Sequence, residues 1–334
     1  TAIMGSDEGL GGFHRQGQPL QSALSDSPVN AWHWLQGVYL AGSAHRRLSD
    51  MSAPNTMISS ADVASLVEKR GTVVLDASWY LPADGRDPEA EFLAARIPGA
   101  QFFDIETIAD TDHECPHMLP SEALFTGVVR SLGIESDTRV VVYDGKGLFS
   151  AARAWWMFRV FGHTKVQILE GGLPGWIAAG YRTESGHAAS LPAGEEFVAT
   201  REREWFADVK VVKAALLDDA SVVLDARSAT RFLGQEPEPR PGVRPGHIPG
   251  SRNLHYAQML TDDPSRLKSA AQLEALFESV GAAEGKTVVT TCGSGISACL
   301  LALALHELGR SPVAVYDGSW AEWGCRADCP VAEG

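Results

Sequence analysis

The sequence has no long apolar run and has few basic residues. Its longest apolar run lies near Ala298–Leu305, well short of the roughly 18 residues that a membrane helix needs. Lysine and arginine number 28 against 42 aspartates and glutamates, which gives a formal net charge of −14. Nucleic acids and anionic membranes attract basic surfaces, so the sequence predicts neither as a partner. An anionic small substrate would need a local positive pocket.

Cysteine is also scarce, with five residues among 334. An odd and widely spread set is no disulfide framework; it favours free thiols and a reducing compartment, so we expect a cytoplasmic location without excluding the mitochondrion. Cys325 and Cys329 could form a redox pair, although incidental placement is the simpler interpretation. His113, Cys115 and His117 lie close together. A proline separates the last two and no second cluster is evident, so we expect no metal and no other cofactor.

The first fifty residues are unlike a targeting segment. They lack the apolar core of a signal peptide, and they carry more acidic residues than a transit peptide. Met51 is a plausible natural start. We therefore expect residues 1–50 to be an untranslated leader, an artificial extension or a disordered segment outside the folded part.

The rest of the chain repeats itself once. Equivalent segments are separated by roughly 150 residues, which is one domain length. The matching segments are residues 73–77 with 222–226, 96–100 with 247–251, 141–147 with 289–295, and 171–176 with 317–323. The sequence therefore predicts a duplication rather than a solenoid.

Each half alternates short β-branched runs with helical patterns. This alternation predicts an α/β fold in which each domain has a parallel sheet with helices on both faces. The predicted boundaries are an N-terminal domain at residues 58–183, a linker at 184–204 that is rich in small and acidic residues, and a C-terminal domain at 205–330.

The segment around Cys292 carries the chemistry. A buried strand is predicted to end at Thr291 and a helix to begin near Ser297, which places the cysteine at the carboxyl end of a parallel strand, where α/β sheets bind ligands. The small, glycine-rich loop can turn its N–H groups inward, and the helix dipole adds positive potential. Both effects favour a thiolate, which is the nucleophilic form of cysteine. A buried structural cysteine is the alternative, and we assign that role to Cys299.

The loop Cys292–Ala298 resembles the active-site loop of 3-mercaptopyruvate sulfurtransferases, in the tandem rhodanese-domain family, although Ile296 and Ser297 stand where valine and threonine are usual. The resemblance runs from about Ile58 to Trp323 and includes residues 76–82, 117–120, 236–240 and 316–320. It implies two tandem rhodanese-like domains. It also implies that the first domain is inactive, because Asp144 occupies the position of Cys292 and a carboxylate cannot carry sulfur.

The resemblance further implies a site and a reaction. Cys292 would attack the sulfur of 3-mercaptopyruvate, carry it as a persulfide while pyruvate leaves, and pass it to a thiol such as thioredoxin or to cyanide. Ser294 would relay a proton. Arg231 and Arg240 would grip the substrate's carboxylate and ketone. The remaining residues expected to bind substrate are Gly293, Gly295, Ile296 and Ser297.

One departure from the family stands before the first Ile-Pro-Gly. Similar enzymes often have a histidine there that works with the loop serine, whereas this chain has Arg96. A relay through a histidine at that position is therefore not expected. Arg96 could instead add positive charge to the interdomain cleft and pair with Asp87, although structural roles for both residues are favoured. The later histidine, His247, is expected to be structural.

Three other functions compete with this interpretation. A cysteine phosphatase needs an arginine six positions after the cysteine, where this chain has Ala298. A thiosulfate sulfurtransferase typically has basic residues directly after the cysteine, to bind a dianion, whereas Gly293 and Ser294 are neutral. A non-catalytic rhodanese module that only binds partners would not need Cys292 in a complete loop.

Overall fold

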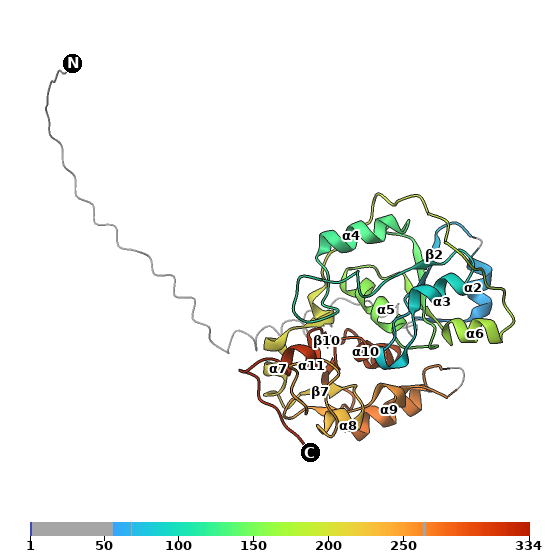
Figure 1. Ribbon diagram of the computed structural model, residues 1–334. Coiled ribbons are helices and arrows are strands. Elements are labelled where there is room, and N and C mark those ends of the chain that lie inside the picture. The colour runs from blue at the N-terminus through green and yellow to red at the C-terminus, as the bar shows by residue number, and fades with distance from the viewer. Residues whose placement is uncertain (2–55, 68, 263–264) are drawn as a thin grey trace.

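A computed structural model describes residues 1, 56–67, 69–262 and 265–334, and Figure 1 shows their arrangement. The segment 1–50, predicted to be a leader, lies outside the described residues except for Thr1, and Met51 lies outside them too.

The first sheet has five parallel strands in the order β1-β5-β4-β2-β3. They are β1 (Met57–Ile58), β2 (Thr72–Asp76), β3 (Gln101–Phe102), β4 (Arg139–Tyr143) and β5 (Val166–Leu169). The helices of this half are α2 (Ser60–Leu66), η1 (Pro82–Asp84), α3 (Pro88–Ala94), α4 (Glu122–Ser131), α5 (Ala151–Val160) and α6 (Gly172–Ala178).

The second sheet repeats the first, with five parallel strands in the order β6-β10-β9-β7-β8. They are β6 (Phe206–Ala207), β7 (Ser221–Asp225), β8 (Arg252–Asn253), β9 (Thr287–Thr291) and β10 (Ala314–Tyr316). The helices are η2 (Arg203–Trp205), α7 (Val209–Ala215), α8 (Ala229–Phe232), η3 (Tyr256–Met259), α9 (Ala270–Ser279), α10 (Ala298–Glu307) and α11 (Ser319–Trp323). The predicted α/β class and duplicated parallel sheets are therefore confirmed.

The period-two alternation of the strands divides the core into layers. In β2, Val73 and Leu75 face a large cluster that also contains residues of the second sheet, while Val74 faces a separate outer cluster of the first domain. In β7, Leu224 faces the shared cluster and Val223 an outer cluster of the second domain. The two domains therefore share one continuous apolar interior.

Helices α5 and α10 fill that shared interior and pack against each other. Both are apolar around nearly their whole circumference, which is the pattern of a helix buried on all sides. Figure 1 shows the first domain above the second, with α10 near the boundary. Helix α5 follows β4 and helix α10 follows β9. Their packing therefore brings the loops after these two strands toward the same domain boundary.

The segment 184–204, predicted to be a linker, lies along the first domain. Glu184 pairs with Arg96 through two backbone hydrogen bonds. Further along, the N–H groups of Glu195 and Glu196 donate to the carboxylate of Glu135 at 2.8 and 2.7 Å. The connecting segment is therefore hydrogen-bonded to the first domain. Among the described residues, no helix is long and apolar enough to cross a membrane.

Candidate active site

Cys292 follows the last residue of β9 at the carboxyl end of the second sheet, where it is a free thiol with 2% of its surface exposed. Its backbone N–H donates to Ser319 Oγ at 3.2 Å, and its carbonyl accepts from Trp320 N–H at 2.9 Å. Ser319 in turn donates to the carbonyl of Tyr316 and has φ of +49°. The first residues of α11 thus fix the main chain that carries the thiol.

The loop after Cys292 presents unused N–H donors. No hydrogen bond within the described part of the chain uses the backbone N–H groups of residues 293–298. Ser297, the N-cap of α10, makes no side-chain capping bond. Free N–H groups at a helix N-terminus attract anions, both as donors and through the helix dipole. A thiolate or a sulfur anion requires donors of this kind, and the role of these donors in binding one stays a prediction.

The equivalent loop of the first domain shows how such N–H groups bind an anion. There, Asp144 occupies the position of Cys292, directly after β4. Its carboxylate accepts from the N–H groups of Lys146, Phe149 and Ala151 at 2.9, 2.6 and 2.9 Å. The first domain therefore fills its own anion cradle with a side chain, which leaves no place for a substrate.

Ser294 contacts a histidine of the first domain. Its Oγ lies 2.9 Å from Nδ1 of His117, whose Nε2 lies 3.0 Å from Oε1 of Glu106. His117 is buried against the edge of the Trp79 indole, which also donates to Glu106. The hydrogen bond with His117 is the main reason that the pKa of Glu106 falls to about 2, so this carboxylate is charged at neutral pH. Serine, histidine and carboxylate in this order can carry a proton.

The sequence gave no reason to expect a relay histidine, because Arg96 stands where similar enzymes often have one. His117 provides the imidazole instead, from the loop between β3 and α4. Neither His117 nor Glu106 was singled out for a role. The available signal was the match of residues 117–120 to the family, which was used only as part of the resemblance.

Arg96 and Asp87 lie elsewhere and do not pair with each other. Arg96 is buried in the first domain, where it forms an ion pair with Glu184 at 3.0 Å and donates to the carbonyl of Gly186. Asp87 is the N-cap of α3 and accepts from Ala90 N–H. Both side chains therefore make contacts within the first domain, and the less favoured alternative, in which Arg96 pairs with Asp87, is contradicted. His247 is structural as expected, because its Nδ1 bonds the carbonyl of Phe232.

Arg231 lies against the active loop. A Cβ atom placed on Gly293 would lie 3.0 Å from Nη2 of Arg231, so the guanidinium packs closely against the glycine. The guanidinium forms an ion pair with the carboxylate of Glu238, whose other oxygen accepts from Arg227 at 2.7 Å. Arg227 is buried and also pairs with Asp225 at 2.7 Å. These linked ion pairs fix the orientation of the Arg231 side chain.

The guanidinium of Arg240 has no direct partner among the described residues, where it makes no hydrogen bond and no ion pair. Only the Arg240 backbone carbonyl is used, since it accepts from the N–H of Val243. Burial is the main cause that lowers its pKa, and repulsion from Arg231 acts in the same direction. The groups whose charges raise it are Cys292, Glu106 and Glu238. Arg240 therefore lies near the thiol with its hydrogen-bond donors unused.

The other predicted loop residues hold the loop in shape. Gly295 has φ of +78°, a left-handed conformation that glycine adopts without strain. Ile296 is buried in the shared core and its carbonyl accepts from Cys299 N–H. Cys299 lies inside α10 with no exposed surface, and burial raises the pKa of its thiol, so it is a core residue as predicted.

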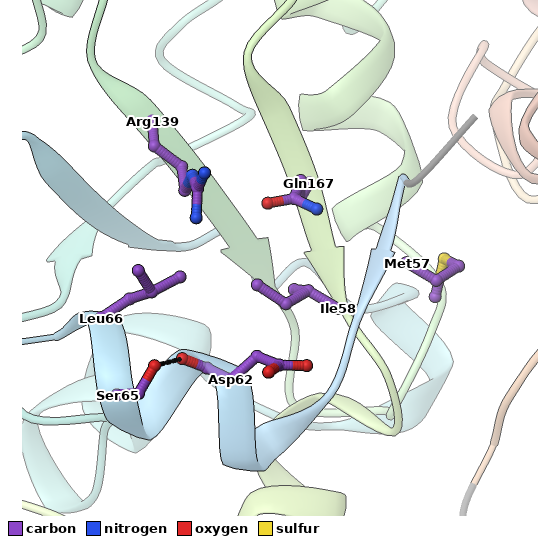
Figure 2. A pocket seen from close by; sticks show the side chains of 7 residues that line it. All are labelled: Met57, Ile58, Asp62, Ser65, Leu66, Arg139 and Gln167. Atoms are coloured by element: carbon purple, nitrogen blue, oxygen red, sulfur yellow. Dashed lines mark hydrogen bonds between the residues drawn. The ribbon is translucent and has the colours of Figure 1, made fainter. Parts of the chain in front are cut away.

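Two further features lie apart from this chemistry. Among the described residues, no group of three histidines, cysteines or acidic side chains could hold a metal. A pocket of about 290 Å³ lies beside β1, β4, β5 and α2 and is lined only by first-domain residues. Figure 2 shows its walls, with Arg139 and Gln167 on strands facing Asp62 and Ser65 on α2. It contains none of the residues around Cys292.

Known proteins resemble this chain over most of its length. The profile of the rhodanese-like domain matches residues 59–179 and 208–324. A 3-mercaptopyruvate sulfurtransferase of Rattus norvegicus is 44% identical over 256 residues, covering 76% of this chain and 85% of that protein. The mitochondrial thiosulfate/3-mercaptopyruvate sulfurtransferase 1 of Arabidopsis thaliana is 43% identical over 279 residues, covering 77% and 73%. The crystal structure of SseA from Escherichia coli, described as a 3-mercaptopyruvate sulfotransferase, superimposes with a TM-score of 0.73 at 37% identity, over 80% of this chain and 99% of that one.

Proposed function

This chain belongs to the rhodanese-like domain family, and we propose that it is a 3-mercaptopyruvate sulfurtransferase that carries sulfur as a persulfide on Cys292. The observation that carries the proposal is the free thiol of Cys292 beside unused N–H groups of its own loop. The carboxylate of Asp144, bound by three such N–H groups in the first domain, shows that a loop of this shape accommodates an anion.

The first half-reaction loads the enzyme. The Cys292 thiolate attacks the sulfur of 3-mercaptopyruvate, an S–S bond forms, and the C–S bond breaks with its electron pair passing to carbon. Pyruvate leaves as its enolate and must gain a proton, while the new persulfide loses the proton that the substrate thiol brought. Ser294 and His117, 2.9 Å apart, can carry that proton from sulfur to carbon, with Glu106 holding the imidazole in place.

The second half-reaction unloads it. An acceptor thiolate or cyanide attacks the outer sulfur of the persulfide, the S–S bond breaks, and Cys292 leaves as a thiolate. Thioredoxin and cyanide are the acceptors proposed. No electron enters or leaves the pair of half-reactions, so this transfer needs no redox cofactor.

The charges around the thiol support 3-mercaptopyruvate as the donor. This substrate carries one negative charge, on its carboxylate, and Arg240 offers a guanidinium with no other hydrogen-bond partner among the described residues. Arg231 lies beside the loop but shares its charge with Glu238. Thiosulfate, a dianion, is the alternative donor. Gly293 and Ser294 are neutral, so they offer no cation for the second negative charge of thiosulfate. The Arabidopsis relative is nevertheless named for both donors.

Mass spectrometry tests the proposal directly. The purified protein is incubated with 3-mercaptopyruvate, the excess is removed, and the intact mass and its peptides are measured. We expect one added sulfur on the peptide that contains Cys292, and none in the variant Cys292→Ser. The exposed Cys325 gives a matched control, because Cys325→Ser should load normally. Sulfur mapped to another cysteine, or turnover that survives in Cys292→Ser, would overturn the assignment.

A comparison of donors tests the substrate. We expect kcat/KM for 3-mercaptopyruvate to exceed that for thiosulfate, and no hydrolysis of p-nitrophenyl phosphate. A preference for thiosulfate would reverse the order of the two donors, and an absence of turnover with either would favour a binding module.

We also propose a cytoplasmic location, which the five free cysteines support because thiols persist in a reducing compartment. Immunodetection in separated cell fractions tests it, and recovery of the protein with mitochondria would contradict it.

A further inference from the structure

A fully buried ion pair crosses the domain boundary next to the site. Arg153, on α5 of the first domain, pairs with Asp317, which follows β10 in the second, through Nη1 and Oδ1 at 2.7 Å. Each side chain is 1% exposed. Burial works against the charge of Arg153, but Asp317 and Cys299 together outweigh it and keep the pKa of the guanidinium raised. The arginine is therefore charged in an apolar interior.

Both partners hold the segment that carries His117. Nη2 of Arg153 donates to the carbonyl of His117, and Oδ2 of Asp317 accepts from the N–H of Leu119 at 2.6 Å. His117 has φ of +60°, which costs energy for a residue other than glycine. A strained residue persists only where its surroundings hold it, and the ion pair contacts the main chain at His117 itself and again two residues later.

The same guanidinium also reaches the active loop. Nη1 of Arg153 donates to the carbonyl of Gly295 at 3.2 Å, one residue beyond Ser294. One planar group thus contacts the segment of His117 from the first domain and the segment of Ser294 from the second. Its rigid fork allows it to fix the distance between them, which a flexible ammonium could not do as well.

Cohesion of the two domains does not require this pair. The shared apolar core already joins them, and replacing a buried ion pair by well-packed apolar residues is often neutral or stabilising. A charged pair at this place therefore calls for another explanation, and the contacts with the two reacting segments provide one.

We propose that Arg153 and Asp317 are positioning residues, which set the hydrogen-bond geometry between His117 and Ser294 for loading of Cys292. The inference rests on the proposed function, since it assumes that these two side chains move the proton during loading. It goes further by assigning the geometry to an interdomain pair that touches neither the substrate nor the thiol.

The rates of the two half-reactions distinguish a positioning role of Arg153 and Asp317 from a purely structural role. Loading from 3-mercaptopyruvate moves a proton, whereas discharge of the persulfide to cyanide moves none. Each rate is measured in a single turnover for Arg153→Met, which keeps much of the volume and removes the fork. We expect loading to slow on the order of 10²-fold, as for a displaced catalytic group, and discharge to change by less than about threefold, within the effect of a small packing change.

Three more variants complete the test. Arg153→Lys keeps the charge beside Asp317 and should recover loading in part; it also serves if Arg153→Met does not fold. Asp317→Asn should slow loading in the same direction. Arg130→Met is the matched control, because Arg130 also donates to a backbone carbonyl, that of Phe197; it should leave the ratio of the two rates unchanged.

Three outcomes overturn the inference, and they are distinguishable. Equal slowing of loading and discharge in Arg153→Met and Arg153→Lys would make the pair structural. Normal loading in His117→Gln would remove the proton relay itself, and the inference would fall with that part of the proposed function. Slow loading in His117→Gln with normal loading in both Arg153 variants would refute only the positioning role.

Discussion

Nδ1 of His117 and Oγ of Ser294 lie 2.9 Å apart although 177 residues separate them in the chain. The first belongs to the domain that has Asp144 at the position of Cys292, and the second follows Cys292 of the other domain by two residues. The candidate site around Cys292 therefore contains side chains from both domains.

The relay predicts that His117→Gln lowers kcat with 3-mercaptopyruvate by about 10²-fold, the lower end of general acid–base effects, with a smaller change in KM. The reason is that glutamine keeps the volume and a hydrogen bond but cannot take up a proton. Steady-state kinetics measure it. The exposed His113 lies in the same loop, and His113→Gln should retain normal kcat. A normal kcat in His117→Gln would exclude the histidine from the reaction.

The unpaired guanidinium predicts that Arg240→Met raises KM for 3-mercaptopyruvate about 10- to 100-fold, which corresponds to one charge-assisted hydrogen bond. We expect a smaller effect on kcat, because the arginine binds the carboxylate in the ground state and the transition state alike. The exposed Arg252 provides a control of equal charge change, Arg252→Met, which should have the KM of the original protein. An unchanged KM in Arg240→Met would place the carboxylate elsewhere.

The surroundings of Gly295 are too close for a larger side chain at this position of the loop. A Cβ there would lie 2.8 Å from the carbonyl oxygen of Asp317 and 2.9 Å from Nη1 of Arg153. Gly295→Ala should therefore lower the free energy of unfolding by at least about 3 kcal/mol, the range of overpacked and strained sites, and abolish sulfur loading.

Gly180 gives the matched control for this loop, since it has φ of +79° but open space around its Cα. Gly180→Ala should cost only the backbone strain, about 1 kcal/mol, and load normally. Urea unfolding measures both variants, and equal losses would show that strain alone matters at Gly295.

The buried carboxyl group of Asp76 is expected to make the stability of the first domain depend on pH. Burial raises its pKa to about 6 from 3.8, with Asp144 acting in the same direction. A raised carboxyl pKa means that the folded state binds more protons than the unfolded state between these values. The contribution to stability is thus present below about pH 4 and is lost as pH rises to about 6, amounting to about 3 kcal/mol at most.

The variant Asp76→Asn isolates this effect, because the amide oxygen can still accept the hydrogen bonds from Ser78 while no charge is buried. We expect its free energy of unfolding, minus that of the original protein, to increase between pH 4 and pH 6 and to stay constant above. Urea unfolding at several pH values measures the difference. A flat difference would mean that Asp76 titrates normally.

The sequence by itself determined the duplicated α/β fold and the loop of Cys292. β-Branched strand runs, glycines and helix patterns are local, and a strand followed by a small-residue loop and a helix places its first loop residue at the sheet edge whatever else the chain does. The equivalence of Asp144 and Cys292 followed from the repeat alone, and the structure places both directly after the corresponding strands, β4 and β9.

Only the tertiary structure decided which residues from the other domain meet that loop. His117 and Arg153 lie far from Cys292 in the sequence, yet His117 contacts Ser294 and Arg153 donates to the carbonyl of Gly295. Arg96 occupies the position at which the family often has a histidine, but it bonds Glu184. The contacts that matter arise because α5 packs against α10 across the shared core. Packing of two buried helices depends on the complementarity of whole surfaces, and no short motif encodes it.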